Sequence, residues 1–482
     1  MIGKQDRWQE DLFVACSLRE LIADDHVLKR VDRVLDLSWL RDEVVDCYCI
    51  DNGRPGIDPE AAVRLMLAGL FQGIVHDRKL MREAQVNLAI RWFAGYRLQE
   101  KLPDHSSLTR IRQRWGAEPF KRIFQRTVQA CCEAGLVDGE TVHIDATLIR
   151  ADVSWESLTT EHIDKVLQAN AVDEGPDHDP RNPRCGRPRT KPKSPKKRSV
   201  TDPDATLATS SKDYRLEPSY KQHTVVDDAS GVILDVDVTT GHASEGKQLL
   251  EQIERVESNA AVAVETVTAD AGYFHAANYI DLEIADIEAV IPPQRENRRP
   301  KRIPLRRFKY DGVHHAVRCP VGRRMLLSCR DQKSSVFRAK TSDCRRCRLR
   351  ARCIPPSAKV RTVRIAEGYT ALLRARRKRL RWDDRTRRLY NRHRWRVEGI
   401  HGEGKTQHGL SRAVRRGLGN VSIQAYLTAA VMSLKRLAAL WLRIVGYVWI
   451  HQGIPAAVRG CQNAPAPVLP HSPCSRNQCR RL

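Results

Sequence analysis

Between residues 138 and 298 the sequence alternates between runs that favour strands and runs that favour helices. The first run, TVHIDATLIRADV, alternates apolar and polar residues and is rich in β-branched ones, which is typical of a strand. Two later β-rich runs flank Asp228 to Gly231 and are expected to pair as a hairpin. In order, we expect a strand (141–153), a hairpin (220–244), a helix (245–257), a strand (261–270), a helix (274–286) and a strand (287–293). This order predicts an α/β fold in which helices flank a mixed sheet.

Helical patterns precede this segment. Between residues 17 and 115 apolar residues recur at helical spacing, and Asp58-Pro59 marks a helix start. Ser106 or Ser107 is expected to cap a later helix, SSLTRIRQRWG. That helix carries a row of basic residues, Arg110, Arg112 and Arg114. Two interpretations stay open: a helix-turn-helix that contacts DNA, or a solvated basic face of a helical bundle.

Changes in composition divide the rest of the chain. Residues 170–213 are polar, basic and rich in proline, which predicts a flexible basic loop. The chain after Gly453 is rich in Pro, Ser and Cys and is expected to be disordered. The predicted organisation is an all-α N-terminal domain (1–120), an α/β core in two parts (138–298 and 368–446), a small basic Cys-rich insertion (299–367) and a disordered tail (447–482).

The chain has 83 Lys and Arg residues against 58 Asp and Glu, a net charge of +25. This excess favours a polyanionic partner, because binding to phosphates releases counterions. A membrane surface is the weaker alternative, since the basic residues are not confined to one amphipathic helix. The apolar segment 423–450 contains Lys435, Arg436 and Arg443, so it predicts a buried helix and no membrane partner. The first ten residues lack an apolar signal region, which favours a reducing cytoplasm for the 14 cysteines.

Three acidic residues stand out by their local setting. Asp145 lies within an apolar strand, Asp270 ends another before Ala-Gly, and Glu398 lies in a predicted helix. Such acids in a groove are costly to desolvate unless positive charge is present. Two Mg²⁺ ions held by a few carboxylates would supply that charge and suit phosphoryl transfer. The alternative is that each acid is an ordinary cap or turn residue, and other acids compete for the role, namely Asp152, Asp235, Asp237 and Glu403.

Glu398 stands at the edge of a very basic run. Residues 371–396 contain twelve Lys or Arg and two acids. On a helix, Arg394 and Lys405 would lie on the same face as Glu398, four residues before it and seven after it. These basic residues could then hold phosphates on either side of a metal-binding carboxylate. The alternative is a surface ladder of ion pairs, which contributes little stability.

A group of cysteines lies within the predicted insertion. Cys344 and Cys347 have the spacing of a metal knuckle, and Cys353 follows them. Cys319 could supply a fourth thiolate, with Cys329 as its substitute. Four thiolates would make a closed structural zinc site. The alternative, four reduced and uncoordinated cysteines, carries equal weight.

Four stretches in order resemble bacterial insertion-sequence transposases of the DDE class. These stretches are IDPEAAVRLMLAGLFQGI through LPDHSSLTRIRQRWG, HIDATLIRADV, TADAGY and RWRVEGIHGEGK. The chain is similar to the branch of the family with a helical N-terminal domain and a Cys-bearing insertion before the glutamate. The resemblance implies an RNase H-like catalytic core built on the mixed sheet.

By position, Asp145, Asp270 and Glu398 match the family's catalytic carboxylates, which implies two bound Mg²⁺ or Mn²⁺ ions. Arg394 and Lys405 match the basic residues of the family's Tyr, Arg, Glu, Lys signature. The tyrosine is one place off, because three residues rather than two separate Tyr390 from Arg394, which leaves its role open. The residues expected to contact DNA are Arg394, Lys405, Tyr390, Arg396, Arg110 and Arg114.

The resemblance implies that the protein cuts transposon ends and transfers the freed 3′-OH into target DNA. Its expected partners are the terminal inverted repeats, the target DNA and a second copy of the chain, at the nucleoid in the cytoplasm. Two alternatives are an inactive transposase-derived DNA-binding protein and an RNase H-like nuclease that only hydrolyses. The presence of all three acids favours an active enzyme.

Overall fold

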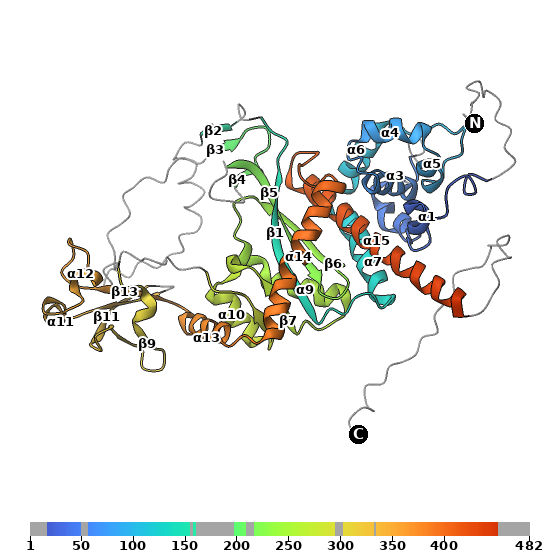
Figure 1. Cartoon of the computed structure of the whole chain (residues 1–482). Coiled ribbons are helices and arrows are strands. Elements are labelled where there is room, and N and C mark those ends of the chain that lie inside the picture. Colours follow the sequence, from blue (N-terminus) through green and yellow to red (C-terminus); the bar gives the residue numbers. More distant parts are fainter. Residues whose placement is uncertain are drawn as a thin grey trace, which may run out of the picture. The chain divides into compact units, whose positions relative to one another are not determined.

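The structure is a computed structural model that describes residues 17–49, 56–154, 158–160, 197–208, 216–294, 302–331 and 334–451 (Figure 1). Residues Met1–Ala438 form one compact unit, and Ala439–Leu482 belong to a second. The elements that position the candidate site all lie in the first unit.

The N-terminal part is helical, as predicted. Its elements are α1 (Val27–Asp32), α2 (Leu40–Val44), η1 (Val45–Cys47), α3 (Pro59–Phe71), α4 (Asp77–Val86), α5 (Leu88–Phe93), α6 (His105–Trp115) and α7 (Glu118–Glu133). Asp58 caps α3 by accepting a hydrogen bond from the Glu60 backbone N–H, with Pro59 at the first helical position. The predicted serine cap of α6 is wrong. Asp104 caps this helix instead, since its carboxylate accepts from the Ser106 N–H at 2.8 Å.

A mixed sheet forms the centre of the α/β core. Its strands are β1 (Thr141–Arg150), β4 (Thr206–Ala208), β5 (Glu217–Asp227), β6 (Ile233–Thr240), β7 (Thr266–Ala269) and β8 (Glu288–Val290). The order across the sheet is β4-β5-β1-β7-β8, and β6 also pairs with β5. β5 is antiparallel to β1, β4 and β6, whereas β1, β7 and β8 run parallel. The predicted order of strand, hairpin, helix, strand, helix and strand is therefore confirmed.

Helices cover both faces of this sheet. The remaining core elements are η3 (Glu245–Gln248), α9 (Leu249–Ala260), η4 (Ala271–Tyr273), α10 (Ala276–Ile284), α13 (Tyr369–Leu380), α14 (Asp384–Gln407) and α15 (Leu418–His451). Thr224 of β5 contacts His401 of α14, whereas Asp235, which pairs with Val225, contacts Arg255 of α9. Because successive residues of a strand point to opposite faces, α14 and α9 lie on opposite faces of the sheet.

The cysteine-bearing insertion is a small β-domain, which the sequence did not predict. An antiparallel sheet of order β13-β12-β11-β10-β9 is built from β9 (Lys309–Asp311), β10 (Ala316–Arg318), β11 (Arg324–Asp331), β12 (Ser334–Arg338) and β13 (Thr362–Ala366). Between β12 and β13 lie α11 (Thr341–Arg345) and α12 (Arg350–Cys353), and η5 (Leu305–Arg307) precedes β9. Phe308, Val317 and Phe337 belong to a hydrophobic cluster separate from that of the core.

Part of the predicted flexible loop is a set of short strands. Residues 161–196 lie outside the described residues, but β3 (Lys197–Ser199) pairs with β2 (Leu158–Thr160), and β4 joins the central sheet. The prediction is therefore wrong for β3 and β4, because backbone pairing with distant strands outweighs their polar composition. The predicted tail from residue 447 also begins too early, since α15 continues to His451. The chain beyond that residue lies outside the described part.

Helix α15 is apolar enough over Leu418–Leu442 to cross a membrane by length and composition. However, 67% of that apolar window is buried inside the protein, as in a core helix. Ala430, Val431 and Leu434 are among its buried residues. The predicted buried helix is thus confirmed over this stretch.

Candidate active site

Asp145 lies on β1, and Asp270 directly follows the neighbouring parallel strand β7. β1 and β7 pair with Ile144 opposite Ala269, so each aspartate comes one residue after a paired position. β7 ends there while β1 continues. Asp270 turns the chain into η4, where its carboxylate accepts a hydrogen bond from the Gly272 backbone N–H at 2.7 Å. Two residues 125 positions apart in sequence are therefore brought together at the end of a short strand.

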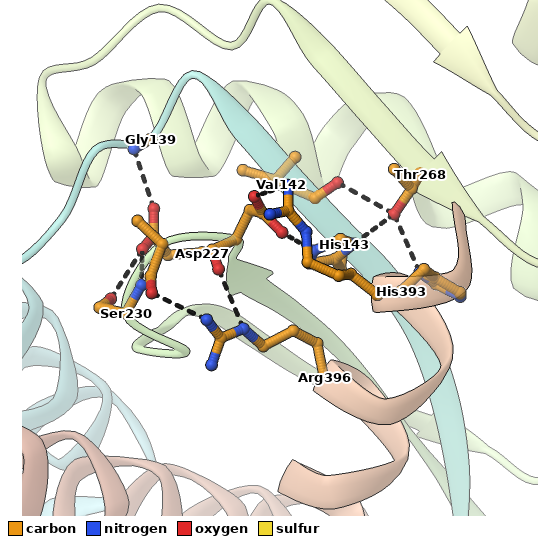
Figure 2. Close-up of polar contacts among 11 residues, drawn as sticks. Gly139, Val142, His143, Asp227, Ser230, Thr268, His393 and Arg396 are labelled. Atoms are coloured by element: carbon orange, nitrogen blue, oxygen red, sulfur yellow. Dashed lines mark hydrogen bonds and ion pairs between the residues drawn. The ribbon is translucent and has the colours of Figure 1, made fainter. Parts of the chain in front are cut away.

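A buried polar network holds α14 against the sheet (Figure 2). The Thr268 hydroxyl of β7 lies between His143 of β1 and His393 of α14, and its oxygen is 2.9 Å from His393 Nδ1. The other ring nitrogen of His143 lies 2.8 Å from the Asp228 carboxylate. Burial lowers the pKa of both histidines, to about 3 for His393. The neutral rings therefore serve as hydrogen-bonding groups.

Arg396 fixes the same helix to the hairpin between β5 and β6. Its Nε donates to the Asp228 carbonyl at 2.9 Å, and its Nη2 donates to the Ala229 carbonyl at 2.8 Å (Figure 2). Arg392 adds an ion pair with the Asp228 carboxylate at 2.6 Å. The hairpin thus determines where α14 lies along the sheet, and so where its carboxylate lies.

Glu398 occupies the exposed border of α14. Its side chain is 63% exposed and pairs with Arg394 at 3.2 Å, as the four-residue spacing predicts. One turn later His401 is buried, with Nδ1 3.8 Å from Asp145 Oδ2 and Nε2 3.2 Å from the Thr224 hydroxyl. Lys405 follows, half-buried and close enough for the charge of Asp145 to affect its pKa. One stripe of α14 therefore faces Asp145.

The carboxylates interact electrostatically. Burial raises the pKa of Asp145 to about 7, and the negative charges of Asp270, Glu245 and Glu398 add to this increase. Burial also raises the pKa of Asp270, with a further contribution from Glu245. These groups therefore share one region in which negative charge is disfavoured. Among the residues that the structure describes, no three His, Cys, Asp or Glu side chains are already arranged to hold a metal ion.

The four other acids that compete for the catalytic role differ from Asp145 and Asp270 by their ion-pair partners. Each forms an ion pair with a basic side chain: Asp152 with Arg412, Asp235 and Asp237 with Arg255, and Glu403 with Lys435 and Arg436. Within the described part of the chain, neither Asp145 nor Asp270 has a Lys or Arg within ion-pairing distance. Tertiary contacts thus distinguish acids that form structural ion pairs from acids without a basic partner. Their spacing in the sequence could not make this distinction.

The other residues expected to contact DNA divide into two groups. Arg110 and Arg114 are exposed on α6, and the Arg114 guanidinium lies 4.8 Å from the centre of the Tyr48 ring. Their neighbour Arg112 is buried and pairs with Asp77. Tyr390 stacks on His393 with 6.0 Å between ring centres. Arg396 is likewise used inside the protein, so these two residues position α14.

Four of the five cysteines of the insertion, Cys319, Cys344, Cys347 and Cys353, lie close enough to influence one another electrostatically. Burial raises the pKa of Cys353, and the charges of Cys344, Cys347 and Cys319 add to this effect. Cys344 and Cys353 are buried. The backbone N–H of Leu349 donates to Cys347 Sγ at 3.4 Å. Within the described residues these thiols do not form a group arranged to hold a metal ion, so the zinc site stays a prediction.

Two residues of this region were missed by sequence reasoning. Glu245 begins η3, and Tyr273 ends η4 beside Asp270. Glu245 stands in a turn sequence, HASEGK, that carries no motif. Its place near Asp145 follows from the contact between η3 and η4, and a pairing of that kind leaves no local signal.

Two family models match the chain. Residues 16–114 match a transposase domain (DUF772), and residues 318–438 match a transposase DDE domain. The second match includes Arg394, Glu398 and Lys405 and begins after both aspartates. No curated protein matches the chain.

Solved structures that resemble the chain include two transposases bound to DNA. One is the piggyBac transposase synaptic complex with hairpin DNA, at 10% identity and a TM-score of 0.31, covering 92% of this chain and 82% of that one. The other is the Mos1 transposase paired-end complex with the left transposon end, at 11% identity and a TM-score of 0.16, covering 52% and 65%. These scores are too low to establish a shared fold.

The two family matches are consistent with a DDE transposase of the insertion-sequence kind, which is the family that the four sequence stretches resemble.

Proposed function

We propose that the chain cleaves transposon ends and transfers them into target DNA, with Asp145, Asp270 and Glu398 holding two Mg²⁺ or Mn²⁺ ions. The observation that supports this most strongly is the juxtaposition of Asp145 and Asp270 without a basic partner among the described residues. The strand order, with β5 antiparallel to β1 and both β7 and β8 parallel to it, fits the RNase H-like core that the resemblance implies.

The donor set fits divalent cations. Carboxylate oxygens are the ligands that Mg²⁺ prefers, and positive charge would remove the cost of ionising Asp145 in a buried site. The Tyr273 hydroxyl is buried close to these acids and has no hydrogen-bond partner within the described residues, so the site has an unsatisfied polar atom. When bound, two such ions activate a water and stabilise the leaving oxygen of a phosphodiester.

The chain's own residues have distinct tasks in this proposal. Arg394 and Lys405 flank Glu398 and would bind backbone phosphates. His401 is buried, and its pKa is lowered to about 3, so a neutral ring separates Asp145 from the helix without adding charge. Arg110 and Arg114 extend the basic surface to the N-terminal domain, where DNA outside the reacting bond would bind. Pairing of two transposon ends would require a second copy of the chain.

Single substitutions test the carboxylates. Asp145→Asn, Asp270→Asn and Glu398→Gln are assayed for cutting of labelled terminal-repeat DNA in Mg²⁺ and in Mn²⁺. Each should lose about 100-fold or more, since even residues behind metal ligands contribute 10- to 100-fold. Asp152→Asn, whose carboxylate pairs with Arg412, is the matched control and should cut normally.

The outcomes distinguish the competing functions. A variant that cuts at the wild-type rate would exclude its carboxylate from the site. A wild-type protein that binds these ends without cutting would be the inactive DNA-binding protein. A protein that cuts but never joins ends to target DNA would be a nuclease.

We also propose that Cys319, Cys344, Cys347 and Cys353 hold a structural zinc ion. Their proximity and the Leu349 N–H to Cys347 Sγ hydrogen bond support this proposal. Purified protein should contain one equivalent of zinc, and Cys344→Ser with Cys347→Ser should lose it while β-domain stability falls. Less than about a tenth of an equivalent in the wild type would disprove zinc binding.

A further inference from the structure

The carboxylate of Glu245 lies near that of Asp270, on the other side of Gly272. A Cβ placed on Gly272 would be 2.8 Å from Asp270 Oδ1 and 3.0 Å from Glu245 Oε2. The two oxygens are therefore no further apart than the sum of those distances, and they face the same small space. Glycine keeps this space open, because any side chain at residue 272 would displace one of the acids.

The other oxygen of Glu245 contacts a lysine. Its Oε1 is 3.0 Å from Lys221 Nζ, and the same ammonium donates to the Ala243 carbonyl at 2.8 Å. The Lys221 side chain is 13% exposed and that of Glu245 is 32% exposed. One carboxylate thus has a cationic partner on one side and an acidic neighbour on the other.

A second, independent feature of the same region is the Tyr273 hydroxyl. The side chain is fully buried, and its hydroxyl has no hydrogen-bond partner among the residues that the structure describes. It lies close enough to Asp145, Glu245 and Asp270 for their charges to act on it. An unpartnered buried hydroxyl costs stability, and a water or carboxylate brought in with a bound cation would satisfy it.

We propose that Glu245 is a fourth carboxylate of the metal site, which binds a divalent cation together with Asp270 and Asp145. Lys221 is the counter-ion of Glu245 when the cation is absent and gives up the carboxylate when the cation binds. This inference rests on the proposed function, because it assumes that Asp145 and Asp270 are cation ligands. The inference adds a ligand from η3, which is a different element from those that carry Asp145, Asp270 and Glu398.

The test measures binding of Mn²⁺ alone to the full chain, without DNA, by calorimetry and by the electron paramagnetic resonance of free Mn²⁺. Glu245→Gln should weaken binding about tenfold or more, as loss of a carboxylate near a metal does. Lys221→Met should strengthen binding, because it removes the competing cation. Glu254→Gln, an exposed acid on α9, is the matched control and should bind as the wild type does.

The opposite directions of the two variants separate the possible roles. If the Glu245 and Lys221 pair were purely structural, both variants would bind more weakly and would melt at a lower temperature, and the inference would be overturned. Wild-type affinity in Glu245→Gln would also overturn it. Should Glu245→Gln fail to fold, Lys221→Met alone decides, since unchanged or weaker Mn²⁺ binding contradicts the counter-ion role.

Failure of this inference can be told from failure of the proposed function. If Asp145→Asn loses Mn²⁺ binding and Glu245→Gln keeps it, the DDE site stands and Glu245 is excluded. If Asp145→Asn and Asp270→Asn both bind Mn²⁺ normally and cut DNA, the proposed function itself fails.

Discussion

Removing the charge of Asp145 should stabilise the metal-free protein at high pH. Burial and neighbouring acids raise the pKa of this carboxyl from 3.8 to about 7. Between those values the folded protein holds a proton that the unfolded chain releases, so the stability falls as the pH rises through this range. The shift is about three units, which corresponds to at most about 4 kcal/mol at pH 8. Asp145→Asn keeps the shape of the protonated acid without ionising.

The assay compares thermal unfolding of the wild type and Asp145→Asn in EDTA at pH 4 and pH 8. The variant should melt several degrees higher at pH 8, and the difference should nearly vanish at pH 4. Mg²⁺ should reduce the difference at pH 8, because it stabilises the wild-type carboxylate. Asp152→Asn should show neither effect, since that acid is half-exposed and paired with Arg412. Equal melting temperatures of wild type and Asp145→Asn at pH 8 would refute the reasoning.

Three further predictions concern other parts of the chain. Asp77→Asn should destabilise the protein by about 3–5 kcal/mol, because it leaves the buried Arg112 and its neighbour Arg415 without their shared carboxylate. Chemical denaturation measures this loss of stability, and a loss below about 1 kcal/mol would contradict the prediction. Arg396→Ala should lower both the melting temperature and DNA cutting by loosening α14, while DNA affinity changes little; a selective loss of affinity would instead make Arg396 a DNA contact. Affinity for DNA should fall steeply with salt, and Arg110→Ala should reduce the slope of log K against log salt by about one. An affinity that does not change with salt would exclude this basic surface as a DNA contact.

Much of the core could be predicted because its signals are local. Alternation of apolar and polar residues marked β1, and Asp228 to Gly231 marked the hairpin between β5 and β6. The Asp58-Pro59 start of α3 was also visible. Each of these features depends on the side chains of a short segment, so it can be read from the sequence without its surroundings.

Features that depend on distant segments were missed. The short strands β3 and β4 lie in a polar stretch that pairs with β2 and β5. The β-domain of the insertion joins segments on both sides of the cysteines. The cap of α6 came from Asp104 rather than a serine, because the helix begins one residue earlier than its apolar pattern suggests.

The sequence by itself determined the residue types at the site, the resemblance to DDE transposases, and the spacing of Arg394, Glu398 and Lys405 along one helix. Only the tertiary structure separated Asp145 and Asp270 from four other acids, since ion pairs with distant arginines and lysines decide which carboxylates are neutralised. It also brought Glu245 and the Tyr273 hydroxyl to the same place. Electrostatic energy depends on distance in space, which the chain order of these residues does not specify.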